Sequence, residues 1–380
     1  MGGFTEQFSV AVRAAGAEFR AALGGDAQTE VEAALAERAE AQWCELPPPA
    51  TADRPVLAVD GASASRQFDH GWTMLVAHAL AVGLAEPETA TAVRFVRSTV
   101  PGAVVQRLGG LLRRLLELKV ALAAARRGPD AVVCIDGSLH TDLPHLIYPL
   151  AVPGEEGLPA ELVGCYADLF RLARRQRVTI VAVSKSSSAT FFGEALWRLG
   201  DDAIGIDAAA AADPALPEVP TDAETLRRFL PGGGYTRPLL LGNHGFGRRG
   251  PPLVHSAQGA EASVPELVDM LRTLPATVAW HQRPRAGEAP LRIDVPATCL
   301  GRSERVVDVY MRWLPPEAVR EVAGWVAGWY GGRQVYHAPL YVADRLVRLA
   351  NDTVDGPYLA IVRDFVGRAV EYERGRRRFL

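Results

Sequence analysis

The fold is decided by residues 131–138, which read Ala-Val-Val-Cys-Ile-Asp-Gly-Ser. Five apolar residues in a row predict a short strand that is buried on both faces, as in a parallel sheet. The strand ends in Asp136, which is followed by a turn-forming glycine. Residues 56–61, Val-Leu-Ala-Val-Asp-Gly, repeat this form: the apolar run ends in Asp60, and a glycine follows. Because ligands bind beyond the carboxyl ends of strands in open α/β sheets, the two acids are candidate site residues.

The segments around these strands predict an α/β protein with a mixed sheet flanked by helices. Residues 71–83 and 91–98 read as two further strands, which with residues 56–60 form an antiparallel trio. Leucines at 108, 111, 112, 115, 118 and 122 predict the buried side of a helix over residues 104–127. A helix over 160–176 and a buried strand over 178–183 follow. The predicted order is therefore strand-strand-strand-helix-strand-helix-strand.

The two ends and the later part of the chain read differently from this core. Residues 1–50 predict a helical N-terminal arm, with apolar residues at 4, 8, 12, 15, 19 and 23 and a second helix over 28–43, before a proline-rich linker at 46–55. We expect residues 51–380 to form one domain, with a core at 55–190 and 331–380. Residues 191–330, rich in Pro and Gly, predict an insertion that extends the sheet with short strands at 238–241, 277–281, 291–295 and 306–313. Closing helices are predicted over 340–349 and 359–374.

Composition narrows the class of protein. The chain has 380 residues, is 48% hydrophobic and carries a net charge of −3, as expected for a globular protein without an overall basic field. Its four cysteines form no Cys-x-x-Cys pair, which argues against a disulfide framework or a structural zinc site. The longest apolar stretch, residues 74–85, is too short for a membrane span and contains His78. The N-terminal residues do not read as a signal peptide, so we expect a cytoplasmic protein.

Three acids point to one chemistry. Asp60 and Asp136 on neighbouring strand ends would repel each other unless a cation lies between them. The alternative is that each simply caps a turn. Glu117 is the only acid between Glu88 and Asp130, and a helix across the sheet would aim it at the same strand ends. The alternative for Glu117 is a surface ion pair with a neighbouring arginine, Arg113 or Arg114.

Carboxylates from the first strand, the first core helix and the fourth strand have the layout of ribonuclease H-like nucleases. In that chemistry the carboxylates hold two divalent cations about 3.5–4 Å apart, which activate water and stabilise the leaving oxygen. A fourth acid from a C-terminal helix often completes such a site. Asp344 is the candidate for it here.

The chain resembles the NurA nucleases over residues 51 to 370. The resemblance is carried by Val-Asp-Gly-Ala-Ser (59–63), the helical Glu117, Ile-Asp-Gly-Ser (135–138), Val-Ser-Lys-Ser (183–186), and Val-Tyr-His-Ala-Pro-Leu-Tyr-Val-Ala-Asp (335–344). It implies a ribonuclease H-like fold and a manganese-dependent deoxyribonuclease, with Mg²⁺ as an alternative ion. It further implies endonuclease activity on single-stranded DNA and 5′ to 3′ exonuclease activity on duplex ends.

By the same resemblance, the protein would be a homodimer that works with the hexameric ATPase HerA in DNA end resection and double-strand break repair. The metal ligands would be Asp60, Glu117, Asp136 and Asp344, holding two Mn²⁺ ions, with Tyr336 nearby. Some members carry His where this chain has Asp344. Either side chain can bind manganese, but the exchange changes the charge of the site.

Lys185 is singled out by a compositional bias. Of 41 basic residues, only Lys119 and Lys185 are lysines. A lysine kept against such an arginine bias is a candidate for a specific chemical role, because the two cations differ in geometry and proton affinity. Lys185 would contact the scissile phosphate or orient the attacking water. The alternative is an exposed loop cation.

Two other functions fit part of the pattern. Actin-like and sugar-kinase-like phosphotransferases also use two Asp-Gly-Ser/Thr strand ends, there around ATP phosphates, but that function leaves Glu117 and Asp344 unused. A scaffold that kept the fold and lost the site is disfavoured, because all four acids are present.

Overall fold

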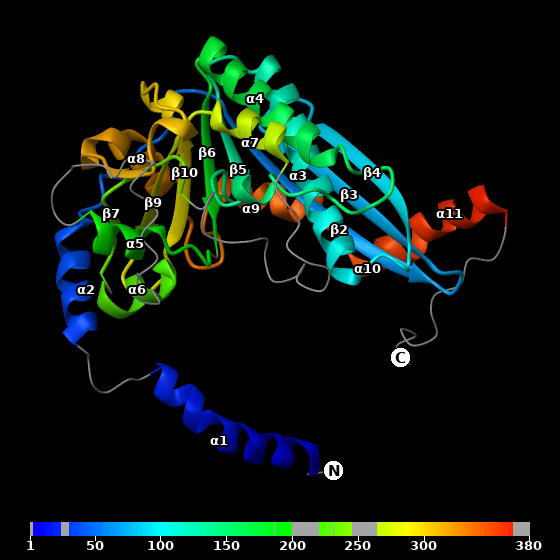
Figure 1. Cartoon of the computed structure of the whole chain (residues 1–380), viewed down its shortest axis with the longest axis horizontal. Coiled ribbons are helices and arrows are strands. Elements are labelled where there is room, and N and C mark those ends of the chain that lie inside the picture. The colour runs from blue at the N-terminus through cyan, green and yellow to red at the C-terminus, as the bar shows by residue number, and fades with distance from the viewer. Residues whose placement is uncertain are drawn as a thin grey trace.

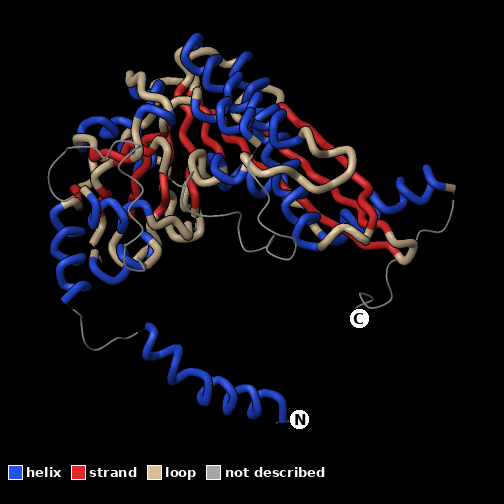
Figure 2. Tube along the Cα trace, in the orientation of Figure 1, coloured by secondary structure: helices blue, strands red, loops and turns tan. Residues whose placement is uncertain are grey.

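An 11-stranded mixed sheet crosses the molecule, with helices on both of its faces (Figure 1, Figure 2). The computed structural model describes residues 3–23, 30–185, 187–199, 220–230, 232–244 and 264–367. The strands are β1 (Trp43–Cys44), β2 (Val56–Phe68), β3 (Trp72–Val82), β4 (Glu88–Arg97), β5 (Val132–Asp136), β6 (Thr179–Ser184), β7 (Gly234–Thr236), β8 (Leu239–Leu241), β9 (Thr277–Arg283), β10 (Leu291–Pro296) and β11 (Met311–Trp313).

The helices lie mainly on the two faces and at the ends of this sheet (Figure 1). They are α1 (Gly3–Leu23), α2 (Glu30–Ala41), α3 (Gly102–Arg127), α4 (Leu158–Gln176), α5 (Phe191–Arg198), α6 (Asp222–Phe229), α7 (Pro265–Arg272), α8 (Arg320–Gly328), α9 (Ala338–Val347), α10 (Asn351–Thr353) and α11 (Leu359–Val366). Among the described residues, no helix is both long and apolar enough to cross a membrane.

The centre of the sheet confirms the predicted order. β2 pairs antiparallel with β3, β3 pairs antiparallel with β4, and β2, β5 and β6 run parallel to one another. This is the ribonuclease H-like arrangement predicted from the sequence. β2 is longer than the predicted strand over 56–60, because its ladder with β3 continues to the pair Phe68 and Trp72. The small residues that follow Asp60 concealed this extension.

Beyond β6 the sheet is continued by residues of the predicted insertion. β10 pairs antiparallel with β6, and β9, β7 and β1 follow in that order, while β8 pairs with both β9 and β11. The strand predicted over 306–313 is wrong in its first half, where residues 306–308 form a short 3₁₀ turn before β11. The carboxylate of Asp308 closes this turn by accepting a hydrogen bond of 2.8 Å from the backbone N–H of Arg305.

The N-terminal residues divide into two parts. α1 lies away from the rest of the chain, with Phe4 90% and Phe8 70% exposed (Figure 1). In contrast, Leu35 and Ala39 of α2 are buried in a core shared with α5 and α6, and β1 joins the sheet next to β7. Within the predicted arm, residues from α2 onward therefore pack against the body. At the other end, α11 ends at Val366, and the last residues of the helix predicted over 359–374 lie outside the described residues.

The two faces of β2 pack against different helices. Successive side chains of a strand point to opposite faces, so Leu57 and Val59 pack in the core beneath α3 and α4, whereas Ala58 packs on the α8 and α9 side. At Gly61 the α3 face carries no side chain. A Cβ atom placed there would lie 2.7 Å from Oε1 of Glu117 and 2.9 Å from Cγ of Arg113. The missing side chain thus lets α3 bring Glu117 against the strand.

Replacing this glycine tests the close approach. Gly61→Ala should lower the free energy of unfolding by about 1–3 kcal/mol, because the added methyl overpacks against Glu117. Gly110→Ala is the control, since a Cβ at that exposed position on α3 meets nothing within 4 Å. The control should stabilise the helix by about 0.5–1 kcal/mol. Denaturant unfolding of both variants measures the difference; equal stability of Gly61→Ala and the parent chain would contradict the packing argument.

Candidate metal centre

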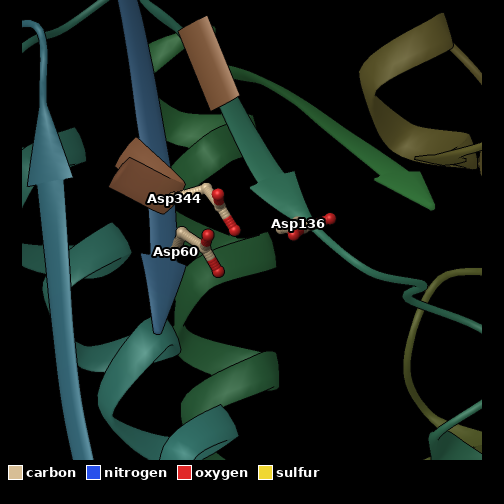
Figure 3. Close-up of side chains that lie close together, drawn as sticks. All are labelled: Asp60, Asp136 and Asp344. Atoms are coloured by element: carbon tan, nitrogen blue, oxygen red, sulfur yellow. The ribbon is translucent and has the colours of Figure 1, made fainter. Parts of the chain in front are cut away.

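Three aspartates from separate parts of the chain meet where the parallel pairing of β2 with β5 ends. Asp60 comes from β2, Asp136 ends β5, and Asp344 lies in α9 (Figure 3). One carboxylate oxygen from each lies within 4.8 Å of the other two. The three predicted ligands Asp60, Asp136 and Asp344 are therefore brought together, although they are up to 284 residues apart in sequence (344 minus 60).

The sequence of α9 explains how Asp344 reaches the strands. His337 caps the helix, because its Nδ1 accepts a bond from the backbone N–H of Leu340, and Pro339 follows in the first turn. Leu340 and Ala343 are fully buried against the sheet. Asp344 is four residues after Leu340, so it lies on the same side of the helix, one turn further along. His337, a histidine beside Tyr336, thus has a structural role.

Asp60 is an acid with a strongly raised pKa. Its side chain is buried, and it accepts a hydrogen bond of 2.7 Å from the backbone N–H of Gly61. Burial, and then the negative charge of Asp136, raise the pKa of Asp60 to about 7, against the opposing effect of the Gly61 bond. Without a bound cation, the site thus resists full ionisation at neutral pH.

Lys185 lies among these acids, as predicted. Its Nζ is 3.3 Å from Oδ2 of Asp136 and 3.5 Å from Oδ1 of Asp344. The same ammonium lies 4.5 Å from the centre of the Tyr336 ring, a cation–π contact. Burial disfavours the charge, but Tyr336 and Asp136 outweigh it and hold the pKa of Lys185 above its usual range. Lys185 is thus a positive charge held beside the aspartates, in an exposed bend that follows β6.

Glu117, the fourth predicted ligand, is not part of this group of carboxylates and lies against Gly61 of β2 on the α3 face of the sheet. It is fully buried, with its Oε2 2.9 Å from Nη1 of Arg114 and its Oε1 3.3 Å from Nη1 of Arg113. Burial raises the pKa of Glu117 more than the two arginines lower it. Among the described residues, Oε1 has no hydrogen-bond partner. The predicted pairing with arginine is real, but the pair is buried and not on the surface.

The donor set fits a hard divalent cation. Asp60, Asp136 and Asp344 each present a carboxylate oxygen to the others. Oxygen ligands of this kind suit Mg²⁺ and Mn²⁺. Glu117 adds a buried oxygen without a hydrogen bond beside Gly61. A cation would relieve the repulsion that raises the pKa of Asp60. The residues present therefore fit the metal chemistry that the sequence predicts.

The sequence did not predict the roles of two residues near the site, Arg114 and Asp294. Arg114 appeared only as one of two possible partners of Glu117, yet it also contacts the main chain at Asp136 and Ser138. Asp294 of β10 was read as part of a short insertion strand, and it binds the segment after Asp136. The available signal was an Arg-Ile-Asp sequence within a strand that is otherwise apolar, since buried charges require partners.

The stability of the metal-free protein should reveal the state of Asp60. A carboxyl group whose pKa is about 7 when folded and 3.8 when unfolded destabilises the fold most above pH 7, and the penalty fades as the pH falls towards 4. In a chelator, Asp60→Asn should therefore melt at a higher temperature than the parent at pH 8, with a difference that vanishes near pH 4. Asp69→Asn, in an exposed turn, is the control and should show no such trend. A pH-independent difference for Asp60→Asn would contradict this.

The model of the NurA domain matches residues 54–349. None of the curated proteins matches the chain significantly. The structure of the NurA nuclease from Sulfolobus solfataricus is similar, with a TM-score of 0.57 and 15% identity, covering 95% of this chain and 97% of that one.

Two further solved structures have the same fold. NurA with manganese has a TM-score of 0.53 and 11% identity, covering 94% of this chain and 98% of the other. NurA bound to dAMP and manganese has a TM-score of 0.52 and 11% identity, covering 93% and 98%. At such identities these structures show a shared fold, and the family model covers more than half of the sequence. The chain belongs to the NurA domain family.

Proposed function

We propose that this chain is a metal-dependent nuclease that hydrolyses phosphodiester bonds in DNA. The observation that carries the proposal is the convergence of Asp60, Asp136 and Asp344, with carboxylate oxygens within 4.8 Å of one another. In the proposal, these three and Glu117 hold divalent cations: two Mn²⁺ ions, with Mg²⁺ as an alternative. Bound cations of this kind supply Lewis-acid chemistry, generating the nucleophile from water and stabilising the leaving oxygen.

The remaining site residues have roles that follow from their charge. The Lys185 side chain is 38% exposed and its ammonium lies between two carboxylates, so it can turn towards a phosphate that enters the site. We assign it the contact to a phosphate oxygen next to the scissile bond. Tyr336 supports it, because the aromatic ring below the ammonium limits the positions that the lysine can take.

The solved relatives support both the metal and the substrate. One of the similar structures contains manganese, and another contains dAMP together with manganese. A nucleotide with a phosphate group beside manganese is what a two-metal nuclease would bind. The manganese in these two structures motivates manganese as the preferred ion of this chain.

We further propose the specific role implied by the resemblance to the family. In it, the chain acts as a homodimer on single-stranded DNA and duplex ends, cutting single strands and degrading from 5′ to 3′ during end resection with a HerA-type ATPase. The exposed apolar side chains Phe4, Phe8 and Val12 of α1 support the existence of a protein partner, because such patches mark interfaces. Adding the ATPase to the nuclease assay below would test this role.

A phosphotransferase is the alternative function. It needs only the two Asp-Gly strand ends, and it gives no task to Asp344 or Glu117. The structure brings Asp344 to the same centre as Asp60 and Asp136. This favours the nuclease. ATP hydrolysis without DNA cleavage, measured on the same preparation, would instead favour the phosphotransferase.

The central experiment is cleavage of end-labelled single- and double-stranded DNA with Mn²⁺, Mg²⁺ or a chelator. Asp136→Asn should lower the cleavage rate by about a hundredfold or more, because the cation clamp is lost. Asp168→Asn, which removes an exposed acid on α4 paired with Arg171, is the matched control and should retain full activity. Full activity of Asp136→Asn, or equal activity in the chelator, would refute the proposed site.

Glu117→Gln decides whether this acid is a ligand or only the partner of arginines. The amide keeps the shape and an oxygen acceptor for Arg114 but loses the negative charge. If Glu117 is a ligand, Mn²⁺ affinity and cleavage both fall, by about tenfold or more. Isothermal titration with MnCl₂ and the cleavage assay measure the two effects. Unchanged Mn²⁺ affinity would remove Glu117 from the ligand set and leave it as the counter-ion of Arg114.

A further inference from the structure

The segment that follows Asp136 is held from the α3 side by one arginine. The guanidinium of Arg114 is almost fully buried and donates bonds to the carbonyl oxygens of Asp136 at 3.2 Å and Ser138 at 3.3 Å. It also binds Oδ2 of Asp142 at 2.9 Å and Oε2 of Glu117 at 2.9 Å. One side chain thus ties both ends of the loop 137–142 to α3.

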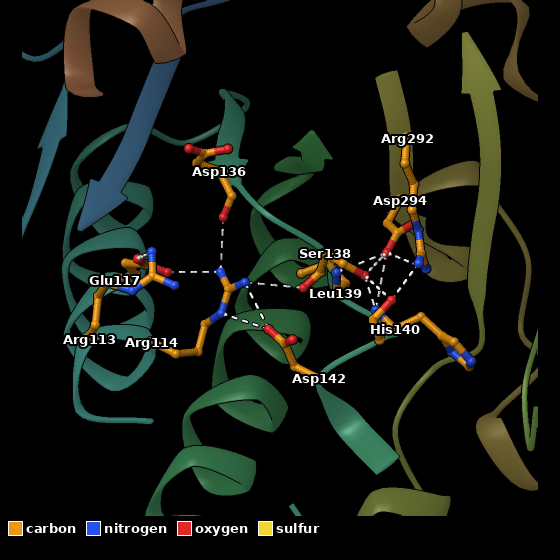
Figure 4. A network of polar contacts seen from close by, with 11 residues as sticks. Arg113, Arg114, Glu117, Asp136, Ser138, Leu139, His140, Asp142, Arg292 and Asp294 are labelled. Atoms are coloured by element: carbon orange, nitrogen blue, oxygen red, sulfur yellow. Dashed lines mark hydrogen bonds and ion pairs between the residues drawn. The ribbon is translucent and has the colours of Figure 1, made fainter. Parts of the chain in front are cut away.

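The same loop is held from the opposite side by an acid of the insertion. Oδ2 of Asp294, in β10, accepts bonds from Oγ of Ser138 at 2.6 Å and from the backbone N–H groups of Leu139 at 2.9 Å and His140 at 3.1 Å. Asp294 is fully buried, and Arg292 compensates its charge with a bond of 2.8 Å from Nε to Oδ1. Figure 4 shows the loop between these two anchors, with contacts on both sides.

Neither anchor has a hydrogen bond or ion pair with the Asp136 carboxylate among the described residues. Arg114 binds the main-chain oxygen of Asp136, and the Asp136 carboxylate points away from it (Figure 4). Gly137 allows this contact, because it has a φ of +100° and a Cβ there would lie 2.6 Å from Nη2 of Arg114. The direction of the Asp136 side chain therefore depends on a main chain that is fixed from outside the metal site.

We propose that Arg114 and Asp294 are positioning residues that fix the loop 137–142 and thereby aim Asp136 at the metal centre. Arg114 also sets the distance between Asp136 and Glu117, because it binds both through one rigid guanidinium. The inference rests on the proposed metal-binding function. It gives the insertion a task in that function, since Asp294 belongs to residues 191–330 and reaches the core.

The competing explanation is that Arg114 only neutralises Glu117. Arg113 separates the two explanations, because it also pairs with Glu117, at 3.3 Å, and makes no hydrogen bond to the loop within the described part of the chain. If neutralisation were the whole role, a lysine in place of either arginine would have a similar effect. If positioning is the role, only Arg114 is sensitive, since lysine cannot reach four acceptors at once.

The test compares Arg114→Lys with its control Arg113→Lys in the full chain. Isothermal titration with MnCl₂ in the absence of DNA should show affinity about 10–100-fold weaker for Arg114→Lys, the range typical of residues that orient metal ligands. Arg113→Lys should stay within about twofold of the parent, as expected for a half-exposed pair. In the cleavage assay, Arg114→Lys should lower kcat with little change in KM for DNA.

Ser138→Ala tests the second anchor, and its small change in volume favours folding. It removes the hydroxyl bonds to Asp294 and Thr141, so the melting temperature should fall slightly. It should weaken Mn²⁺ binding by less than Arg114→Lys does, because the two backbone bonds to Asp294 remain. Unchanged Mn²⁺ affinity in Ser138→Ala together with either unchanged affinity or failure to fold in Arg114→Lys would overturn the inference. Absence of Mn²⁺ binding by the parent chain would instead refute the proposed function, so the two failures are distinguishable.

Discussion

Repulsion between carboxylates is the constraint on which the rest of the site depends. Asp60, Asp136 and Asp344 converge within 4.8 Å, and burial leaves Asp60 little water to screen them. The fold tolerates this arrangement because Lys185 supplies a positive charge between Asp136 and Asp344. The same repulsion favours the binding of a divalent cation, because the cation would neutralise the negative charge of the three carboxylates.

Two groups of charged residues lie on opposite faces of β2. The three aspartates lie together where the pairing of β2 with β5 ends, beside α9, whereas Glu117 and its arginines approach from α3. Gly61 is the point of contact, since only a residue without a side chain lets Glu117 come this near to the strand. The arginines keep this buried acid compensated, so the fold does not carry an unpaired charge in its core.

The region predicted as an insertion, residues 191–330, contributes to the central sheet. Its strand β10 continues the sheet next to β6 and places Asp294 beneath the loop that follows Asp136. The structural relatives share the fold at 10–15% identity over nearly the whole chain. A sheet can persist through such divergence because its core needs apolar residues of suitable volume, not particular ones.

The sequence by itself determined the central strand order, the helix over most of residues 102–127 and the placement of Asp60 and Asp136 on neighbouring core strands. These follow from local patterns, namely apolar runs, leucine periodicity and Asp-Gly turns, which neighbouring residues can express. It also indicated Lys185 through composition. Only the tertiary structure decided that β2 extends to Phe68 and that Glu117 is buried beside two arginines. It also decided that Arg114 and Asp294 both form hydrogen bonds to the loop 137–142. Those features depend on contacts between residues far apart in the chain, and no local pattern encodes which distant partner will satisfy a buried charge.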